Sequence, residues 1–162
     1  MKETEVLIDQ ILEDHKDIKQ DLAEAVNDST ALAELDNIKG DFVPGRFDQK
    51  QSLERLQATL EKVAAGLEEH FTREEKGLLV AFERSGDEEI AAGLRAIFQE
   101  HEEIRARLAH SKEHVAQLIG GGLSSHLWAA SAHDMRTHLS QTRRMIEAHA
   151  GVEQDFFQKL KK

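Results

Sequence analysis

A chain of 162 residues is long enough to bury one hydrophobic core and too short for two domains of ordinary size. Its formal net charge of −10 disfavours nucleic acid as a partner, because contact with phosphates needs a basic surface. No apolar run approaches the roughly 18 residues that cross a bilayer, and the first five residues are unlike a secretory signal, so no membrane partner is expected.

The composition favours one helical domain and is compatible with a reducing compartment. The chain has no cysteine, which excludes a disulfide framework, a thiolate metal site and a thiol nucleophile. A reducing cytosol is compatible with this, and we predict a cytoplasmic protein. The single proline and the 32% of charged residues favour helix over sheet. We expect one domain over residues 1–162.

Four segments carry apolar residues at spacings of three and four, and this pattern predicts four helices. The first helix is predicted over residues 4–25, because the polar residues 27–29 interrupt its pattern. The second begins at a cap formed by Asp48 with Gln51 three residues on, and it ends near Ser85.

The third and fourth helices follow after short connections. The third opens at a capping box of Ser85 and Glu88 and ends at the three glycines of residues 120–122. The fourth opens at Ser124 or Ser125. Short connections between long helices favour antiparallel neighbours. The expected fold is therefore an all-α, up-down-up-down antiparallel four-helix bundle.

Each predicted helix carries a histidine at a position where its apolar stripe calls for a hydrophobic residue. In the second and fourth helices a glutamate follows that histidine by four residues, a turn of about 400° that keeps both side chains on one face. Buried without partners, such groups would cost several kcal/mol, so their burial needs a reason. The candidate residues are His15, His70, Glu74, His101, His149 and Glu153.

The depth of these residues favours a joint site. Taken singly, an inward histidine is more often a hydrogen-bonded core residue than a ligand. Measured from the end of the bundle where the first helix starts, however, the four histidines lie at depths of roughly 16 to 24 Å at 1.5 Å per residue, which is nearly one layer. Unrelated core histidines need not align in this way. We therefore predict one metal site.

The residue types narrow the choice of metal. Imidazole and carboxylate suit Fe, Zn or Mn. Six ligands are too many for one tetrahedral zinc and suit two ions, each held by terminal imidazoles and bridged by Glu74 and Glu153. The other large class of di-iron bundles relies on Glu-x-x-His pairs, and none occurs in this sequence.

Together, His15, residues 70–75, His101 and residues 149–153 resemble the hemerythrin-like, or HHE cation-binding, family over nearly the whole chain. This resemblance implies a non-haem centre of two iron ions, oxo- or hydroxo-bridged, that binds dioxygen or another small diatomic or peroxide ligand. Members of the family carry oxygen, sense oxygen or iron, store iron, or react with peroxide or nitric oxide.

Two departures from the oxygen-carrying members affect this expectation. Those members have a second histidine four residues after the one on the third helix, where this chain has Arg105, and their fourth helix uses His-x-x-x-x-Asp, where position 154 is Gln. With one imidazole fewer, the irons are expected to be more open and easier to oxidise irreversibly, which favours sensing or redox chemistry over oxygen carriage. Arg105 cannot ligate, so we expect it to pair with Glu74 or Glu153, or to extend outward along its stem.

The other five histidines are not expected to be ligands. His138 shares the inner face of the fourth helix and is predicted to be a satisfied core residue. His110 and His114 have the His-x-x-x-His spacing but point away from the stripe, so they are expected to be solvated. His126 and His133 also lie off the stripe and are expected at the surface.

Three functions remain open from the sequence. The first is a binding domain that responds to oxygen or iron without fast turnover. The second is an oxidoreductase that acts on peroxide, oxygen or nitric oxide at the same centre, and the third is a zinc-bound or metal-free structural bundle. No nucleotide-binding loop and no serine or cysteine nucleophile identifies an organic substrate.

Overall fold

The computed structural model describes residues 2–35, 47–120 and 125–160, and every element within them is helical. The predicted all-α class is confirmed for these residues. The elements are α1 (Lys2–Leu35), α2 (Phe47–Thr72), the π-helix η1 (Arg73–Leu78), α3 (Leu79–Ser85), α4 (Glu88–Phe98), α5 (Glu100–Gly120) and α6 (Ser125–Leu160).

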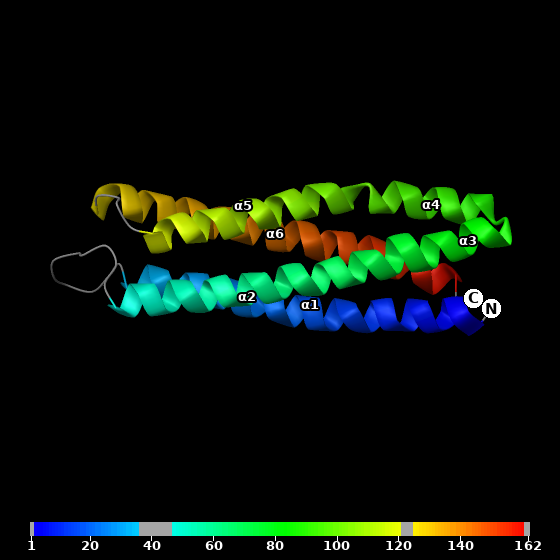
Figure 1. Cartoon of the computed structure of the whole chain (residues 1–162), viewed down its shortest axis with the longest axis horizontal. Coiled ribbons are helices and arrows are strands. Elements are labelled where there is room, and N and C mark those ends of the chain that lie inside the picture. The colour runs from blue at the N-terminus through cyan, green and yellow to red at the C-terminus, as the bar shows by residue number, and fades with distance from the viewer. Residues whose placement is uncertain (1, 36–46, 121–124, 161–162) are drawn as a thin grey trace.

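These elements form four long rods that lie side by side (Figure 1). The elements α2, η1 and α3 follow one another without a gap and make one rod, and α4 and α5 make another with a break at Gln99. The helix α1 packs against α2 and α6, and α5 packs against the same two helices. The start of α1 and the end of α6 lie at the end of the molecule where α3 meets α4 (Figure 1).

The first two helices differ from their predicted boundaries. The helix α1 continues through residues 27–29, because their polar groups find partners there: Ser29 Oγ donates to the carbonyl of Val26 at 2.8 Å, and Thr59 Oγ1 of α2 donates to Asp28 Oδ2 at 3.2 Å. The helix α2 starts at Phe47, so the predicted cap residue Asp48 lies inside its first turn. Ser124 lies outside the described residues, and α6 begins at Ser125.

The turn between α3 and α4 also differs from the prediction. Asp87, not Ser85, caps α4, and its Oδ1 accepts from the backbone N–H of Ile90 at 3.3 Å. The hydroxyl of Ser85 instead donates to a carbonyl one turn back in α3. Gly86, with φ of +80°, makes the left-handed turn between the two helices. The predicted capping box is wrong by two residues for this reason.

Two clusters of buried hydrophobic residues lie on either side of the predicted ligand positions in every rod. Each fully buried Leu, Ile or Phe side chain adds about 1.5–3 kcal/mol to the free energy of unfolding. The cluster near the chain ends, called here the near cluster, consists of Ile8, Ile11, Leu78, Phe82, Ala91, Leu94, Phe98 and Phe157. The middle cluster consists of Ile18, Leu22, Val63, Leu67, Phe71, Ile104, Leu108 and Ile146.

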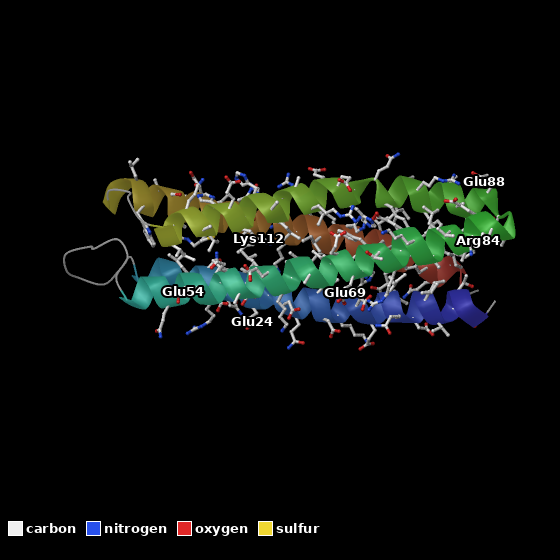
Figure 2. All side chains as sticks on the ribbon, in the orientation of Figure 1. Glu24, Glu54, Glu69, Arg84, Glu88 and Lys112 are labelled. Carbon is white, nitrogen blue, oxygen red and sulfur yellow. The ribbon has the colours of Figure 1, made fainter. Side chains whose placement is uncertain are left out.

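The outer faces of the rods are charged, as expected of amphipathic helices (Figure 2). Glu24, Glu54, Glu69 and Arg84, which Figure 2 labels, are all exposed. In the described part of the chain, no helix combines the length and the apolar character needed to cross a membrane.

The left-handed turn gives a first prediction. Gly86→Ala should lower the free energy of unfolding by about 1 kcal/mol, because an alanine Cβ disfavours a positive φ. Gly66→Ala, inside α2 where an added Cβ meets no atom within 4 Å, should raise it by up to about 1 kcal/mol. Urea unfolding of both variants measures the two changes. A stabilising Gly86→Ala would show that the turn does not require the left-handed conformation.

Candidate metal centre

The six residues predicted as ligands lie together in one layer between the near cluster and the middle cluster. Five of them are at most 5% exposed, while the His15 side chain keeps an exposed fraction of 10%. They come from α1, α2, η1, α5 and α6, so every rod contributes. The periodicity of the sequence was therefore sufficient to identify a single polar layer within the core.

Glu74 lies in a turn wider than that of an α-helix, which sequence reasoning missed. The backbone N–H of Leu79 donates to the carbonyl of Glu74, five residues back. Four residues of an α-helix rotate by about 40° more than a full turn. Four residues of this wider helix rotate by less than a full turn. The π-helix therefore keeps both Glu74 and Leu78 buried. Single π turns often occur at functional sites.

The carboxylate of Glu74 lies between imidazoles of two rods. Its Oε1 is 3.1 Å from Nε2 of His70 and 3.3 Å from Nε2 of His101. The ring of His101 also stacks against the rings of Phe71 and Phe98. Its centroid lies 3.8 Å from that of Phe71 and 4.8 Å from that of Phe98. Glu74 thus faces a histidine on its own rod and a second histidine that aromatic packing holds in place.

The carboxylate of Glu153 faces three imidazoles. Its Oε1 is 2.8 Å from Nε2 of His149, one turn back on α6. The same oxygen is 3.8 Å from Nε2 of His15 and 3.8 Å from Nε2 of His70. Glu153 therefore connects α6 with both α1 and α2.

The histidines form two pairs with the carboxylates between them. The ring centroids of His15 and His70 are 4.9 Å apart, and those of His101 and His149 are 5.0 Å apart. The possible ligand atoms fall into two groups in which all atoms lie within 4.8 Å of one another. One group is His15, His70 and Glu153, and the other is Glu74, His101, His149 and Glu153.

Several buried atoms of this layer have no partner in hydrogen-bonding geometry among the described residues, although some of them lie within 3.3 Å of another atom of the layer. They are Nε2 of His15, His101 and His149, both carboxylate oxygens of Glu74, and Oε2 of Glu153. A buried polar atom without a partner costs about 1–3 kcal/mol, and a charged one costs more. Cations held by these atoms would remove that cost. The nitrogen and oxygen donors, with no sulfur among them, fit Fe, Zn or Mn.

Three of the four histidines have a carboxylate at Nδ1, the ring nitrogen that faces away from the layer. Such a carboxylate favours the tautomer with the proton on Nδ1, which leaves the Nε2 lone pair directed into the layer. The pairs are His70 with Asp14 at 3.3 Å, His101 with Glu75 at 3.1 Å and His149 with Glu100 at 3.3 Å.

These outer carboxylates follow a pattern around the bundle. Asp14, Glu75 and Glu100 each stand next in sequence to a residue of the layer, and each reaches a histidine on the neighbouring rod. On α6 the corresponding neighbour is Gln154, which has no carboxylate, and Nδ1 of His15 has no hydrogen-bond partner in the part of the chain that the structure describes. The ring of His15 is therefore the least restrained.

Arg105 extends outward, and the predicted alternative of an ion pair with a buried glutamate is wrong. Its guanidinium donates to Glu68 at 3.0 and 3.1 Å and to Oε2 of Glu75 at 3.0 Å. Its Cζ lies 5.0 Å from the ring centroid of Phe71. Arg105 therefore holds Glu75, which in turn contacts Nδ1 of His101.

Among the other histidines, those whose side chains the structure describes lie outside the layer. His138 is half-buried, with its ring 4.7 Å from that of His110 and its Nε2 3.4 Å from a backbone carbonyl of α5. His114 is half-buried and lies 2.7 Å from a serine hydroxyl of α6, so the prediction of a solvated pair is wrong for it. His133 is exposed, as expected, while the side chain of His126 lies outside the described ones.

Burial and the neighbouring charged groups together set the protonation of the layer in the absence of a cation. Burial, with a neighbouring imidazole adding to it, lowers the pKa of His15 to about 4 and that of His149 to about 4. Burial also lowers the pKa of His70, but nearby carboxylates outweigh it, so this pKa is raised overall. Burial raises the pKa of Glu74, but the adjacent histidines outweigh it and the pKa falls below its usual value.

A helical bundle with a buried layer of imidazoles and carboxylates defines a class of cation-binding proteins. The family model described as "Hemerythrin HHE cation binding domain" matches residues 6–160. The chain therefore belongs to the hemerythrin HHE cation-binding family, and the resemblance predicted from its sequence is confirmed. Searches of curated proteins and of solved structures found no match.

The lowered pKa values predict how pH affects the metal-free protein. Between pH 6.5 and 4 the unfolded chain protonates His15 and His149 while the folded chain does not, so stability should fall as pH falls through this window. The loss should be on the order of 3 kcal/mol per histidine. His15→Leu should remove about half of the slope. Urea unfolding of chelator-treated protein across this range measures both, and a flat profile would contradict the buried neutral rings.

The outer carboxylates predict a second effect. Glu75→Gln should weaken metal affinity by about 10- to 100-fold without changing the number of ions bound, because His101 loses the charge that orients its ring. Glu103→Gln, an exposed change on α5, is the matched control. Competition of Zn²⁺ between the protein and a chelator measures affinity. Equal affinities in the two variants would contradict a positioning role for Glu75.

Proposed function

We propose that this protein is a single-domain, up-down-up-down bundle that holds two iron ions and binds or senses a small ligand such as dioxygen, in the cytoplasm. The two ions would share the buried layer. One would be held by His15 and His70, the other by His101 and His149, with Glu74 and Glu153 bridging.

The position of the carboxylates between the histidine pairs carries this proposal. Oε1 of Glu74 lies near one histidine of each pair, His70 and His101. Oε1 of Glu153 also reaches both pairs, through His149 on one side and His15 on the other. A carboxylate that bound a single ion would lie beside only one of the two histidine pairs. The position of both carboxylates between the pairs therefore supports two adjacent ions that share them as ligands.

Iron bound here would supply electrons and open coordination positions for a small molecule. The residues of the chain determine how many positions stay open. Arg105 is turned toward Glu68 and Glu75 and offers no ligand atom. Six ligand residues would leave more coordination positions open than seven would. The near cluster excludes water from one side of the layer. A site with open coordination positions suits the binding of a small molecule and redox chemistry, whereas protein ligands fill every position of a structural metal site.

A second function, reduction of peroxide, oxygen or nitric oxide at the same centre, is favoured by one observation. A cavity of about 650 Å³ touches His15, His70, His149 and Glu153, which gives a reacting molecule a place beside the layer. A zinc-bound or metal-free structural bundle would have no use for such a space.

Metal analysis tests the proposal. Protein purified without oxygen and supplied with Fe²⁺ should bind two irons per chain and develop ferric absorption near the ultraviolet edge when air is admitted. Glu153→Ala should lower the iron content well below two, because a bridging carboxylate serves both ions. His138→Ala, on the same helix but outside the layer, should leave it unchanged.

Zinc in place of iron, or no bound metal, would contradict the di-iron assignment. Full iron content in Glu153→Ala with loss in His138→Ala would contradict the ligand set. Stopped-flow mixing of the reduced protein with hydrogen peroxide then separates the two functions, since an enzyme turns over repeatedly with a reductant and a sensor reacts once.

A further inference from the structure

The cavity beside the layer is far larger than a diatomic ligand needs. Its volume of about 650 Å³ lies within the range of about 300–1,000 Å³ typical of pockets for small organic molecules. A water molecule, which is comparable in size with dioxygen, occupies about 30 Å³. The space is therefore more than an order of magnitude too large for the small ligands of the proposed function alone.

The wall of this cavity is mostly hydrophobic. Side chains of the middle cluster line it on four helices, and these are Ile18, Leu22, Leu67, Phe71, Ile104 and Ile146. His15, His149 and Glu153 form its polar inner end. An apolar wall of this extent fits an alkyl chain, because each buried methylene group contributes about 0.8 kcal/mol of binding.

The rim of the cavity carries two lysines: Lys16 pairs with Glu13 at 3.3 Å, and Lys19 has no ion pair among the described residues. Lys16 and Lys19, three residues apart on α1, both line it and are exposed. Glu147, the acidic residue of the α6 side of the rim, already pairs with Arg143 at 2.9 Å. The rim therefore offers the ammonium group of Lys19 to an anion at the surface.

Small residues of α6 also line the cavity. Ala150 and Gly151 line the cavity, and a Cβ added at Gly151 meets no atom within 4 Å. A larger side chain at this position would thus project from the rim without disturbing the packing of α6.

We propose that this cavity binds a medium-chain fatty acid, with its alkyl chain along the apolar wall, its methyl end toward His15 and Glu153, and its carboxylate at Lys19, beside Lys16. The inference rests on the proposed function in that the ligand would lie against the same metal centre. It adds a class of organic ligand to the small molecules that the centre binds.

Calorimetric titration of the metal-loaded protein with hexanoate, octanoate and decanoate tests the proposal without any mutation. Affinity should rise about fourfold for each added methylene group until the cavity is full. Equal affinities along the series, or no binding of decanoate, would overturn the inference.

Variants of the rim test the position of the ligand. Gly151→Leu should weaken decanoate binding at least tenfold, whereas Gly66→Leu, a matched change at an open helical glycine outside the cavity, should alter it less than twofold. The double change Lys16→Gln with Lys19→Gln should weaken binding of decanoate about fivefold and leave that of decanol unchanged. Equal effects in the two glycine variants, or no effect of removing the lysines, would overturn the assigned site.

Metal content, measured on the same samples, separates this inference from the proposed function. Two irons per chain without decanoate binding would overturn the fatty-acid site and leave the metal centre standing. Decanoate binding with the predicted chain-length dependence in a protein that takes up no iron would support the cavity site and overturn the di-iron function. Circular dichroism of each variant confirms that a change in affinity does not reflect unfolding.

Discussion

Burial of four imidazoles and two carboxylates in one layer of the core is the constraint on which the rest of this structure depends. Without cations, atoms of Glu74, His101, His149 and Glu153 are buried and lack hydrogen-bond partners among the described residues. Such a layer works against folding. The two hydrophobic clusters on either side offset this cost, and they hold the ligand atoms close together before any cation arrives. The stability of the bundle and its capacity to bind metal therefore oppose each other in the empty protein and act together in the loaded one.

The helices are irregular where they meet this layer. The π turn of η1 contains Glu74, and the break at Gln99 lies two residues before His101. Regular α-helical geometry rotates residues at four-residue spacing steadily off the inner face. A wider turn and a break correct that rotation, so that hydrophobic residues on both sides of the layer can face the core together with the ligands. Departures from local regularity at a functional site are the expected cost of placing polar groups there.

The two halves of the layer are not equivalent. His70, His101 and His149 each have a carboxylate at Nδ1, whereas His15 has none and keeps the largest exposure of the six. The cavity opens on the same side, between α1 and α6. His15 is therefore the least restrained ring of the layer, whereas the ring of His101 is stacked between two aromatic rings.

The sequence by itself determined the helical class and the six residues of the layer, because a period of 3.6 residues and a rise of 1.5 Å per residue define both the face and the depth of a side chain. The family followed from the resemblance of these residues to its motifs. The sequence did not determine the partners of those residues. Asp14, Glu75 and Glu100 act across helices, the direction of Arg105 depends on Glu68 of another rod, and the cavity lies between α1 and α6. Periodicity within one helix contains no information on the rotation of its neighbours or on the rotamers they permit. Only tertiary packing decided these contacts, for that physical reason.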